Sequence, residues 1–123
     1  MPESALHQWH DAVNTANLEQ ARRVVSDPVV VNGPHGSGAI SATDFADWIT
    51  RSGIRLQPVS WHPVAERIVV VEQDATWPEA PEPARVATVF RLTGDHVSAA
   101  LRFPDRAQAL AFASLYAALL ETP

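Results

Sequence analysis

Residues 84–103 have the sequence ARVATVFRLTGDHVSAALRF, and this stretch decides the fold. Two runs rich in β-branched and aromatic residues flank the segment TGD, where Gly94 can adopt the positive φ of a tight turn. The stretch therefore predicts an antiparallel hairpin. Residues 54–63 and 66–77 have the same extended character, so we expect a meander of four antiparallel strands. The proline-rich segment PEAPEP at 78–83 predicts a solvated, polyproline-like loop between the second and third of them.

Helical patterns precede the meander. Residues 4–16 place Leu6, Trp9 and Val13 on one apolar stripe, which predicts a first helix. Residues 17–25 follow, with a capping asparagine at their start, and predict a second helix. A third helix is expected over residues 41–53, from a capping serine to a terminating glycine.

Two further segments complete the chain. The β-branched run VVVN at 29–32 predicts a short strand, which the turn-rich stretch GPHGSG at 33–38 ends. Asp105, with Gln108 three residues later, predicts the start of a closing amphipathic helix. We therefore expect an α+β fold in which a cone-shaped, curved antiparallel sheet wraps around the N-terminal helices, with an added C-terminal helix. Residues 1–123 are expected to form a single domain with a conical cavity.

Composition excludes several classes of function. Nine Lys and Arg against fourteen Asp and Glu give a net charge of −5, which argues against nucleic-acid binding. No apolar run is long enough to span a membrane, and the N-terminal residues lack the pattern of a secretory signal, so we expect a cytoplasmic protein.

The loop at 33–38 lacks the glycine spacing of a dinucleotide site, and no cofactor is expected. His7 and His10 on one helix offer at most two ligands, so no metal site is expected.

Several loose motifs together resemble the nuclear transport factor 2-like superfamily, also called ketosteroid-isomerase-like or cystatin-like. They are the helix link A-x-N-x-x-N-L at 12–18, the strand V-V-V-N-G-P at 29–34, the glycine loop and the G-x-x-V hairpin, and the resemblance covers residues 4–105. It implies the cone-shaped fold already expected. It leaves the function open, because the superfamily includes isomerases, dehydratases, polyketide cyclases, epoxide hydrolases and domains that only bind.

The resemblance argues against ketosteroid isomerase activity. Aligned on the helix link, Trp9 stands where that enzyme has its tyrosine, and an indole N–H is a weaker partner for an oxyanion than a phenol. The general-base position falls on Gly33, beside Asn32, and neither residue takes a proton at neutral pH. The third position falls on Thr88, a neutral hydroxyl in place of a protonated carboxylic acid.

We expect the cavity to bind a small apolar or aromatic molecule, because the chain has four tryptophans and the resemblance places several aromatic residues on the inner wall. The expected ligand-binding residues are Trp9, Val13, Asn32, His35, Phe45, Trp48, Trp61, Trp77, Thr88, Phe90, Leu101 and Phe103. An alternative is an enzyme of the polyketide-cyclase, dehydratase or hydrolase type, for which the candidate catalytic residues are His35, Asn32 and Asp105. A second alternative is an accessory protein whose tryptophans fill the cone.

The sequence also predicts which residues lie on the outer face of the sheet. Val69, Val71, Ala75 and Trp77 alternate with Glu72 and Asp74, so the apolar set should face inward and the acids outward. We expect the acids to be solvated or to pair with Arg91 and Arg102. The apolar residues Ile68, Val70 and Val89 should remain on the outer face, and with the resemblance they indicate a homodimer formed through it.

Overall fold

One sheet of six strands organises the protein, and the computed structural model describes residues 2–33 and 36–122. The strands are β1 (Val25–Gly33), β2 (Gly36–Ile40), β3 (Arg55–Ala65), β4 (Ile68–Trp77), β5 (Ala80–Thr93) and β6 (His96–Phe103). Their order in the sheet is β2-β1-β6-β5-β4-β3, with β1 and β6 parallel and all other neighbours antiparallel. The predicted meander is therefore confirmed for β3 to β6, and β1 and β2 extend it.

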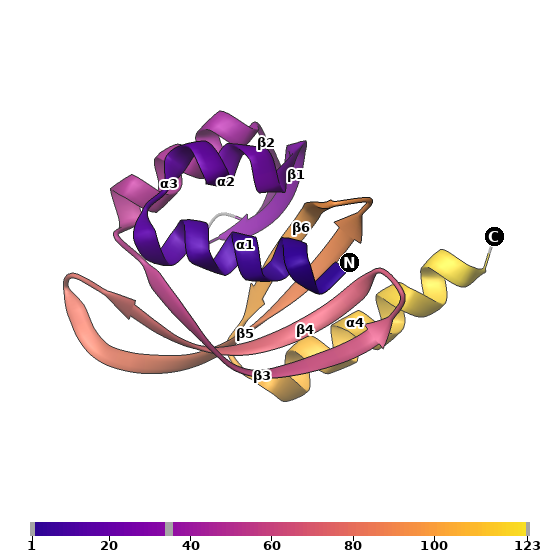
Figure 1. Ribbon diagram of the computed structural model, residues 1–123. Coiled ribbons are helices and arrows are strands. Elements are labelled where there is room, and N and C mark those ends of the chain that lie inside the picture. Colours follow the sequence, from indigo (N-terminus) through magenta and orange to yellow (C-terminus); the bar gives the residue numbers. More distant parts are fainter. Residues whose placement is uncertain (1, 34–35, 123) are drawn as a thin grey trace.

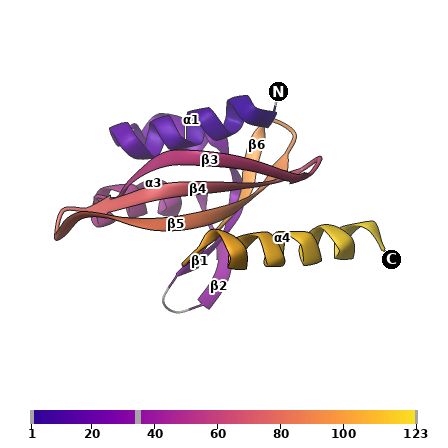
Figure 2. The same cartoon turned by 90° about the horizontal axis from the view of Figure 1, so that it is seen from below.

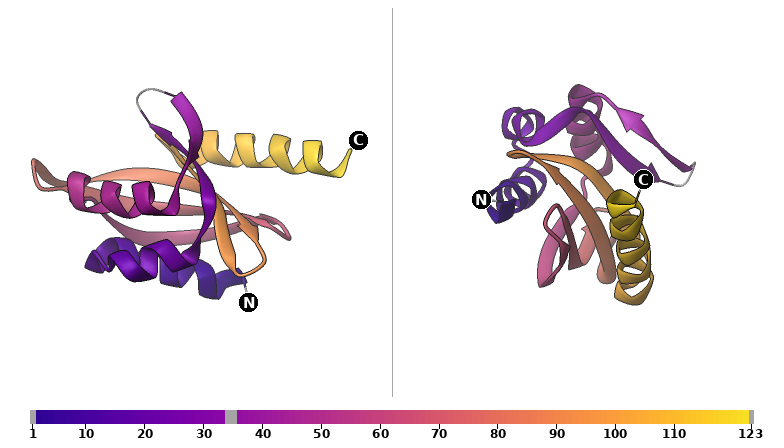
Figure 3. Two further views of the ribbon diagram at one scale, coloured as in Figure 1. Left: turned by 90° about the horizontal axis from the view of Figure 1, so that it is seen from above. Right: turned by 90° about the vertical axis from the view of Figure 1, so that its right-hand side faces the viewer.

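Helices cover both faces of this sheet. They are α1 (Pro2–Thr15), α2 (Leu18–Val24), α3 (Ala42–Ser52) and α4 (Arg106–Glu121). The first three lie together on the concave side, and α4 crosses the opposite face of β3, β4 and β5 (Figures 1 and 2). Figure 3 shows α4 continuing beyond the sheet toward the C-terminus. The α+β fold, the curved sheet and the added C-terminal helix are confirmed.

Helices α3 and α4 begin at the predicted capping residues. The Ser41 hydroxyl accepts the N–H three residues later at 3.0 Å, and the Asp105 carboxylate does the same at 2.8 Å, so each caps its helix. Gly53 follows α3 with a φ of 64°. A Cβ at this position would lie 2.7 Å from the ring of Pro78, so both the backbone conformation and the available space require glycine.

The expected polyproline-like loop at 78–83 is wrong, because β5 already begins at Ala80 and pairs there with Trp77 of β4. Prolines are tolerated in this part of β5 for a simple reason. Its pairing with β6 extends only to Ala87, so residues 80–84 have β4 on one side and no strand on the other. A proline whose missing N–H would have faced the open edge costs no ladder hydrogen bond.

The expected turn-rich stretch at 33–38 is wrong in part, because Gly36 opens strand β2. That strand pairs with β1 from Val29 opposite Ile40 to Gly33 opposite Gly36. Its sequence GSGAI has low β propensity, and four of its five residues are exposed. Backbone pairing with β1 defines this strand, and its sequence shows no alternation of apolar residues that would have predicted it.

Both faces of the central strands are buried, and this overturns one expectation about exposure and one about side-chain direction. Ile68, Val70 and Val89 do face outward, but α4 covers them and leaves each at most 1% exposed. They are therefore no open surface for a homodimer. Leu101 and Phe103, expected in the cavity, pack in the same outer cluster. Because β6 carries apolar residues on both sides, hydrophobicity alone could not tell which side faces inward.

Asn14 ties α1 to the edge strand β3. Its side-chain N–H donates to the Leu56 carbonyl at 2.8 Å, and its side-chain oxygen accepts the Leu56 N–H at 2.7 Å. β3 is the last strand of the sheet, so this backbone edge has no neighbouring strand to satisfy it. The asparagine amide acts as a one-residue strand partner, which satisfies two backbone groups and fixes the helix over the sheet.

Asn14→Ala should lower the free energy of unfolding by about 2 kcal/mol, because it leaves two part-buried backbone groups of Leu56 without partners. The matched control is Thr15→Ala, which removes an exposed hydroxyl bonded within the same helix and should change stability by less than about 0.5 kcal/mol. Urea unfolding of both variants measures the difference. Equal stabilities would mean that water replaces the asparagine at this edge.

Candidate ligand-binding site

A half-open cavity of about 890 Å³ lies between the N-terminal helices and the sheet, which is the position expected for a cone-shaped fold. Its volume is within the range of small-molecule sites. Most of its wall is apolar, and these residues are Trp9, Leu18, Val31, Ile40, Phe45, Trp48, Leu56 and Ala100. Its polar lining residues are Asn32, Asp44, Asp47, Thr50, Arg51, Thr88 and Arg102.

Three aromatic rings form one side of this cavity. Trp9 and Phe45 stack with their centroids 6.0 Å apart and their planes 29° apart. Phe45 and Trp48 continue the stack at 5.9 Å and 27°. Trp9 is anchored from behind by Phe90, whose ring meets it edge-on at 4.8 Å. Trp9 and Phe45 are each only 2% exposed, whereas Trp48 is half-buried and gives the cavity its most accessible ring. Together the three rings form an apolar wall suited to an apolar or aromatic group.

The structure brings five of the expected ligand-binding residues together in the cavity wall. They are Trp9, Asn32, Phe45, Trp48 and Thr88. Val13 and Phe90 are fully buried in the core behind the wall. Trp61 is 36% exposed on β3 and contacts the rings of His7 and His10, away from the cavity.

The remaining candidates have other positions. Trp77 does not line the cavity but lies under the guanidinium of Arg102, 5.6 Å from its ring centroid, and Leu101 and Phe103 face α4. Asp105 caps α4 on the surface, and its hydrogen bonds to Gln108 lower the pKa of its carboxyl. His35 lies outside the described residues.

Asn32 lines the cavity, and its amide already makes two hydrogen bonds to the backbone. The side-chain N–H donates to the Arg102 carbonyl at 2.9 Å, and the side-chain oxygen accepts the Arg102 N–H at 2.8 Å. These two bonds join β1 to β6 just beyond the last paired residues of the two strands, Val31 and Ala100. The expected catalytic candidate therefore has a structural role that holds the backbone of Arg102 in place.

Sequence reasoning missed the charged residues of the cavity. Asp44, Asp47 and Arg51 lie on one exposed face of α3, at the three- and four-residue spacing of a helix, and form part of the cavity rim. Arg102 was assigned to the outer acids, yet it lines the cavity from β6. The Arg102 side chain points into the cavity because Ala100, two residues earlier on the same strand, also faces inward.

A buried chain of hydrogen bonds leads from α1 to the cavity. The Leu6 carbonyl can only accept, so Nδ1 of His10, 2.8 Å away, must carry a proton. In the neutral ring Nε2 is then an acceptor for the side-chain N–H of Gln73 at 2.9 Å. The Gln73 oxygen in turn accepts the Thr88 hydroxyl proton at 2.7 Å. Thr88 therefore has no proton left for a ligand and can serve only as an acceptor.

The chain is almost completely buried. His10 is 3% exposed, Gln73 is fully buried and Thr88 is 3% exposed. Burial lowers the pKa of His10 from 6.5 to about 4, with smaller effects from its bond to Leu6 and from the charges of His7 and Asp11. The imidazole is consequently neutral at pH 7, so its Nε2 can accept the Gln73 N–H. By contrast, the indole N–H of Trp9 is buried and has no acceptor among the described residues.

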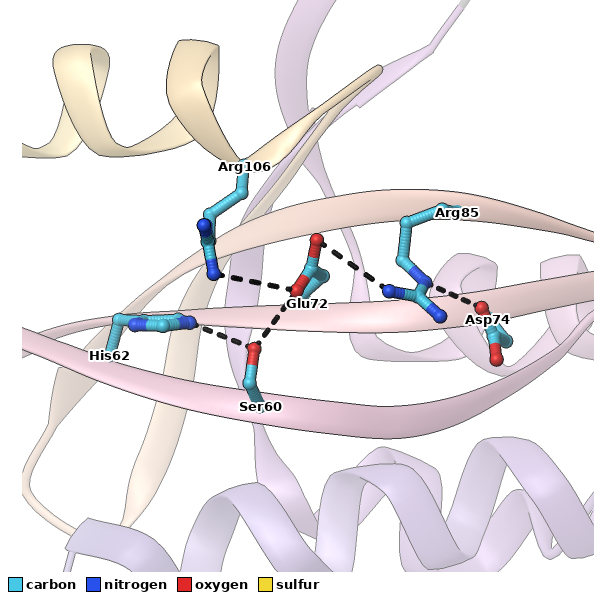
Figure 4. A network of polar contacts seen from close by, with 6 residues as sticks. All are labelled: Ser60, His62, Glu72, Asp74, Arg85 and Arg106. Atoms are coloured by element: carbon cyan, nitrogen blue, oxygen red, sulfur yellow. Dashed lines mark hydrogen bonds and ion pairs between the residues drawn. The ribbon is translucent and has the colours of Figure 1, made fainter.

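A second polar cluster lies on the outer face of the sheet (Figure 4). The expected partners of the acids are wrong: Asp74 pairs with Arg85 at 2.6 Å, and Glu72 lies 3.8 Å from Arg85 and 3.9 Å from Arg106. Arg91 instead bonds Ser98 and Tyr116.

The Ser60 and His62 side chains belong to this outer cluster, but they do not form a catalytic triad. Ser60 donates its proton to Glu72 at 3.0 Å, so Nε2 of His62, 2.8 Å from the same hydroxyl, must donate to it. A triad needs the histidine to accept the serine proton and the acid to hold the histidine. Here the serine stands between the other two, and the arrangement is a network that links β3 and β4.

Two general features can be stated for residues 2–33 and 36–122. No group of three or more His, Cys, Asp or Glu side chains in these ranges is placed to hold a metal ion. None of the helices in the same ranges is long and apolar enough to cross a membrane.

The buried His10 predicts a loss of stability in acid. Its folded pKa of about 4 lies below the unfolded value of 6.5, so the unfolded chain binds a proton first as the pH falls. Stability is therefore complete above pH 6.5 and declines toward pH 4 by about 3 kcal/mol from this group. His10→Gln should lose this part of the pH dependence in urea unfolding, whereas His7→Gln, at an exposed site, should retain it. Parallel pH profiles for the wild type and His10→Gln would contradict the argument.

Comparisons with known proteins support the fold. No model of a known protein family and no curated protein matches the chain. Among solved structures, a nuclear transport factor 2-like protein of unknown function from Cytophaga hutchinsonii has a TM-score of 0.74 at 12% identity, over 84% of this chain and 88% of that one. A candidate polyketide cyclase from Sinorhizobium meliloti has a TM-score of 0.70 at 10% identity, over 81% and 94% of the two chains.

A third solved structure contains a small molecule. It is a hypothetical protein with a ketosteroid isomerase-like fold from Catenulispora acidiphila, in complex with trimethylamine. Its TM-score is 0.64 at 15% identity, over 89% of this chain and 91% of that one. At sequence identities this low, structural similarity shows the fold but does not indicate a particular activity. The chain therefore has the nuclear transport factor 2-like, or cystatin-like, α+β fold.

Proposed function

We propose that the protein binds a small apolar or aromatic molecule inside the cone. The observation that carries this proposal is the stacked wall of Trp9, Phe45 and Trp48 along a cavity of about 890 Å³. A ligand against this wall would bury its own apolar surface together with the exposed part of Trp48, at about 25 cal/mol per Å². The cavity volume also favours binding over an accessory role in which the tryptophans themselves fill the cone.

An enzymatic role of the cyclase, dehydratase or hydrolase type has less support from the cavity wall. The Asn32 amide bonds the backbone of Arg102, and the Thr88 proton is committed to Gln73. Asp105 caps α4 outside the cavity. The carboxylates that do line the cavity, Asp44 and Asp47, are exposed residues of α3 at the rim. Binding is therefore the function that the arrangement of side chains supports best.

The proposal is tested by thermal unfolding with 2-naphthalenemethanol, a neutral planar probe. At a hundredfold excess over its dissociation constant a ligand adds about 2.7 kcal/mol, which raises the melting temperature by several degrees. Trp48→Ala should lose this shift, because it removes one ring of the wall. Trp61→Ala is the matched control: it removes the same side chain from outside the cavity and should keep the shift. No shift in the wild type, or an equal shift in all three proteins, would refute the proposal.

A further inference from the structure

Arg102 is a cationic side chain in a largely apolar cavity wall. It lies on β6 directly opposite Thr88 of β5, and both residues line the cavity. The Asn32 side chain bonds the backbone of Arg102, which fixes the position of the Arg102 Cα. The guanidinium lies over the ring of Trp77 at 5.6 Å, a cation–π contact that supports it from one side.

The guanidinium of Arg102 makes no hydrogen bond or ion pair with another described residue. The other half-buried arginines differ: Arg55 donates to the Val13 and Ile54 carbonyls, and Arg91 donates to Ser98. Removal of water around Arg102 lowers the pKa of its guanidinium, so the charge carries a desolvation cost. A partly buried cation without an anion is costly, and a ligand anion would offset that cost.

The polar groups beside Arg102 on the sheet are weaker binders of an anion than its guanidinium, because they are neutral and already hydrogen-bonded. The Thr88 hydroxyl gives its proton to Gln73, and one of the two N–H groups of the Asn32 amide donates to the Arg102 carbonyl. The acids Asp44 and Asp47 lie at the exposed rim on α3, where water and salt screen their charges. Arg51, on the same exposed face, is the other cation of the lining.

We infer that the ligand is an aromatic carboxylate, with its ring against the wall of Trp9, Phe45 and Trp48 and its carboxylate bound by Arg102. This inference rests on the proposed function. A planar carboxylate matches the two parallel N–H groups of a guanidinium. One guanidinium balances the single charge of a carboxylate, whereas a phosphate dianion would bring a second charge into the apolar wall.

The test compares two probes of nearly equal shape, 2-naphthoate and 2-naphthalenemethanol, by calorimetric titration at pH 7. The wild type should bind the acid at least tenfold more tightly than the alcohol, since hydrogen bonds to charged groups are worth about 1.5–3 kcal/mol. Arg102→Met retains the apolar stem and should bind both probes equally, with the affinity for the alcohol within about threefold of the wild type. Arg85→Met removes the same charge from the outer face and should keep the preference.

Each outcome separates this inference from the proposed function. If the wild type binds the alcohol as tightly as the acid, or if Arg51→Met and not Arg102→Met abolishes the preference, the carboxylate assignment is overturned while the binding cavity stands. If neither probe binds the wild type, both fall together. If Arg102→Met loses both probes, Arg102→Lys must restore alcohol binding with a reduced preference for the acid, and its failure to do so overturns the assignment.

Discussion

The two hydrogen bonds between the Asn32 side chain and the backbone of Arg102 are the constraint on which the cavity depends. β1 pairs in parallel with β6 only as far as Val31 and Ala100, and on its other side it pairs with β2. Beyond that point, the Asn32 side chain supplies the donor and the acceptor that a backbone partner of Arg102 would otherwise have supplied. The two backbones therefore do not have to remain side by side. β1 can therefore diverge with β2 while the backbone of Arg102 stays satisfied, and the Arg102 side chain enters the cavity beside Thr88.

Local signals in the sequence predicted the elements well. The caps of α3 and α4 and the turn at Gly94 depend on residues within a few positions of one another, so no tertiary information is needed to read them. Strand β2 and the start of β5 have no such signal. The sequence GSGAI becomes a strand because β1 supplies its backbone partners, and prolines enter β5 because its far edge is open there.

The cavity itself was predictable only in part, because α4 makes the sheet apolar on both faces. Alternation in β4 did place Val69, Val71 and Ala75 inward, since Glu72 and Asp74 mark the other side. β6 offers no comparable marker: its outward pair Leu101 and Phe103 is more apolar than its inward pair Ala100 and Arg102. An arginine that faces inward contradicts the usual rule for strands, and such contradictions concentrate at functional sites. The homodimer stays a prediction, but Ile68, Val70 and Val89 no longer support it because α4 covers them.

The direction of the hydrogen-bond chain behind the cavity adds a further limit on any ligand. The Leu6 carbonyl fixes the proton on His10, the histidine orients the Gln73 amide, and the amide takes the proton of Thr88. Reversing the chain would require a protonated His10, which burial disfavours at neutral pH. The sheet side of the cavity therefore presents an acceptor at Thr88 and a donor fork at Arg102, on residues that lie opposite each other in β5 and β6. In a wall that is otherwise mostly apolar, one fixed acceptor beside one fixed donor is sufficient to orient a bound molecule.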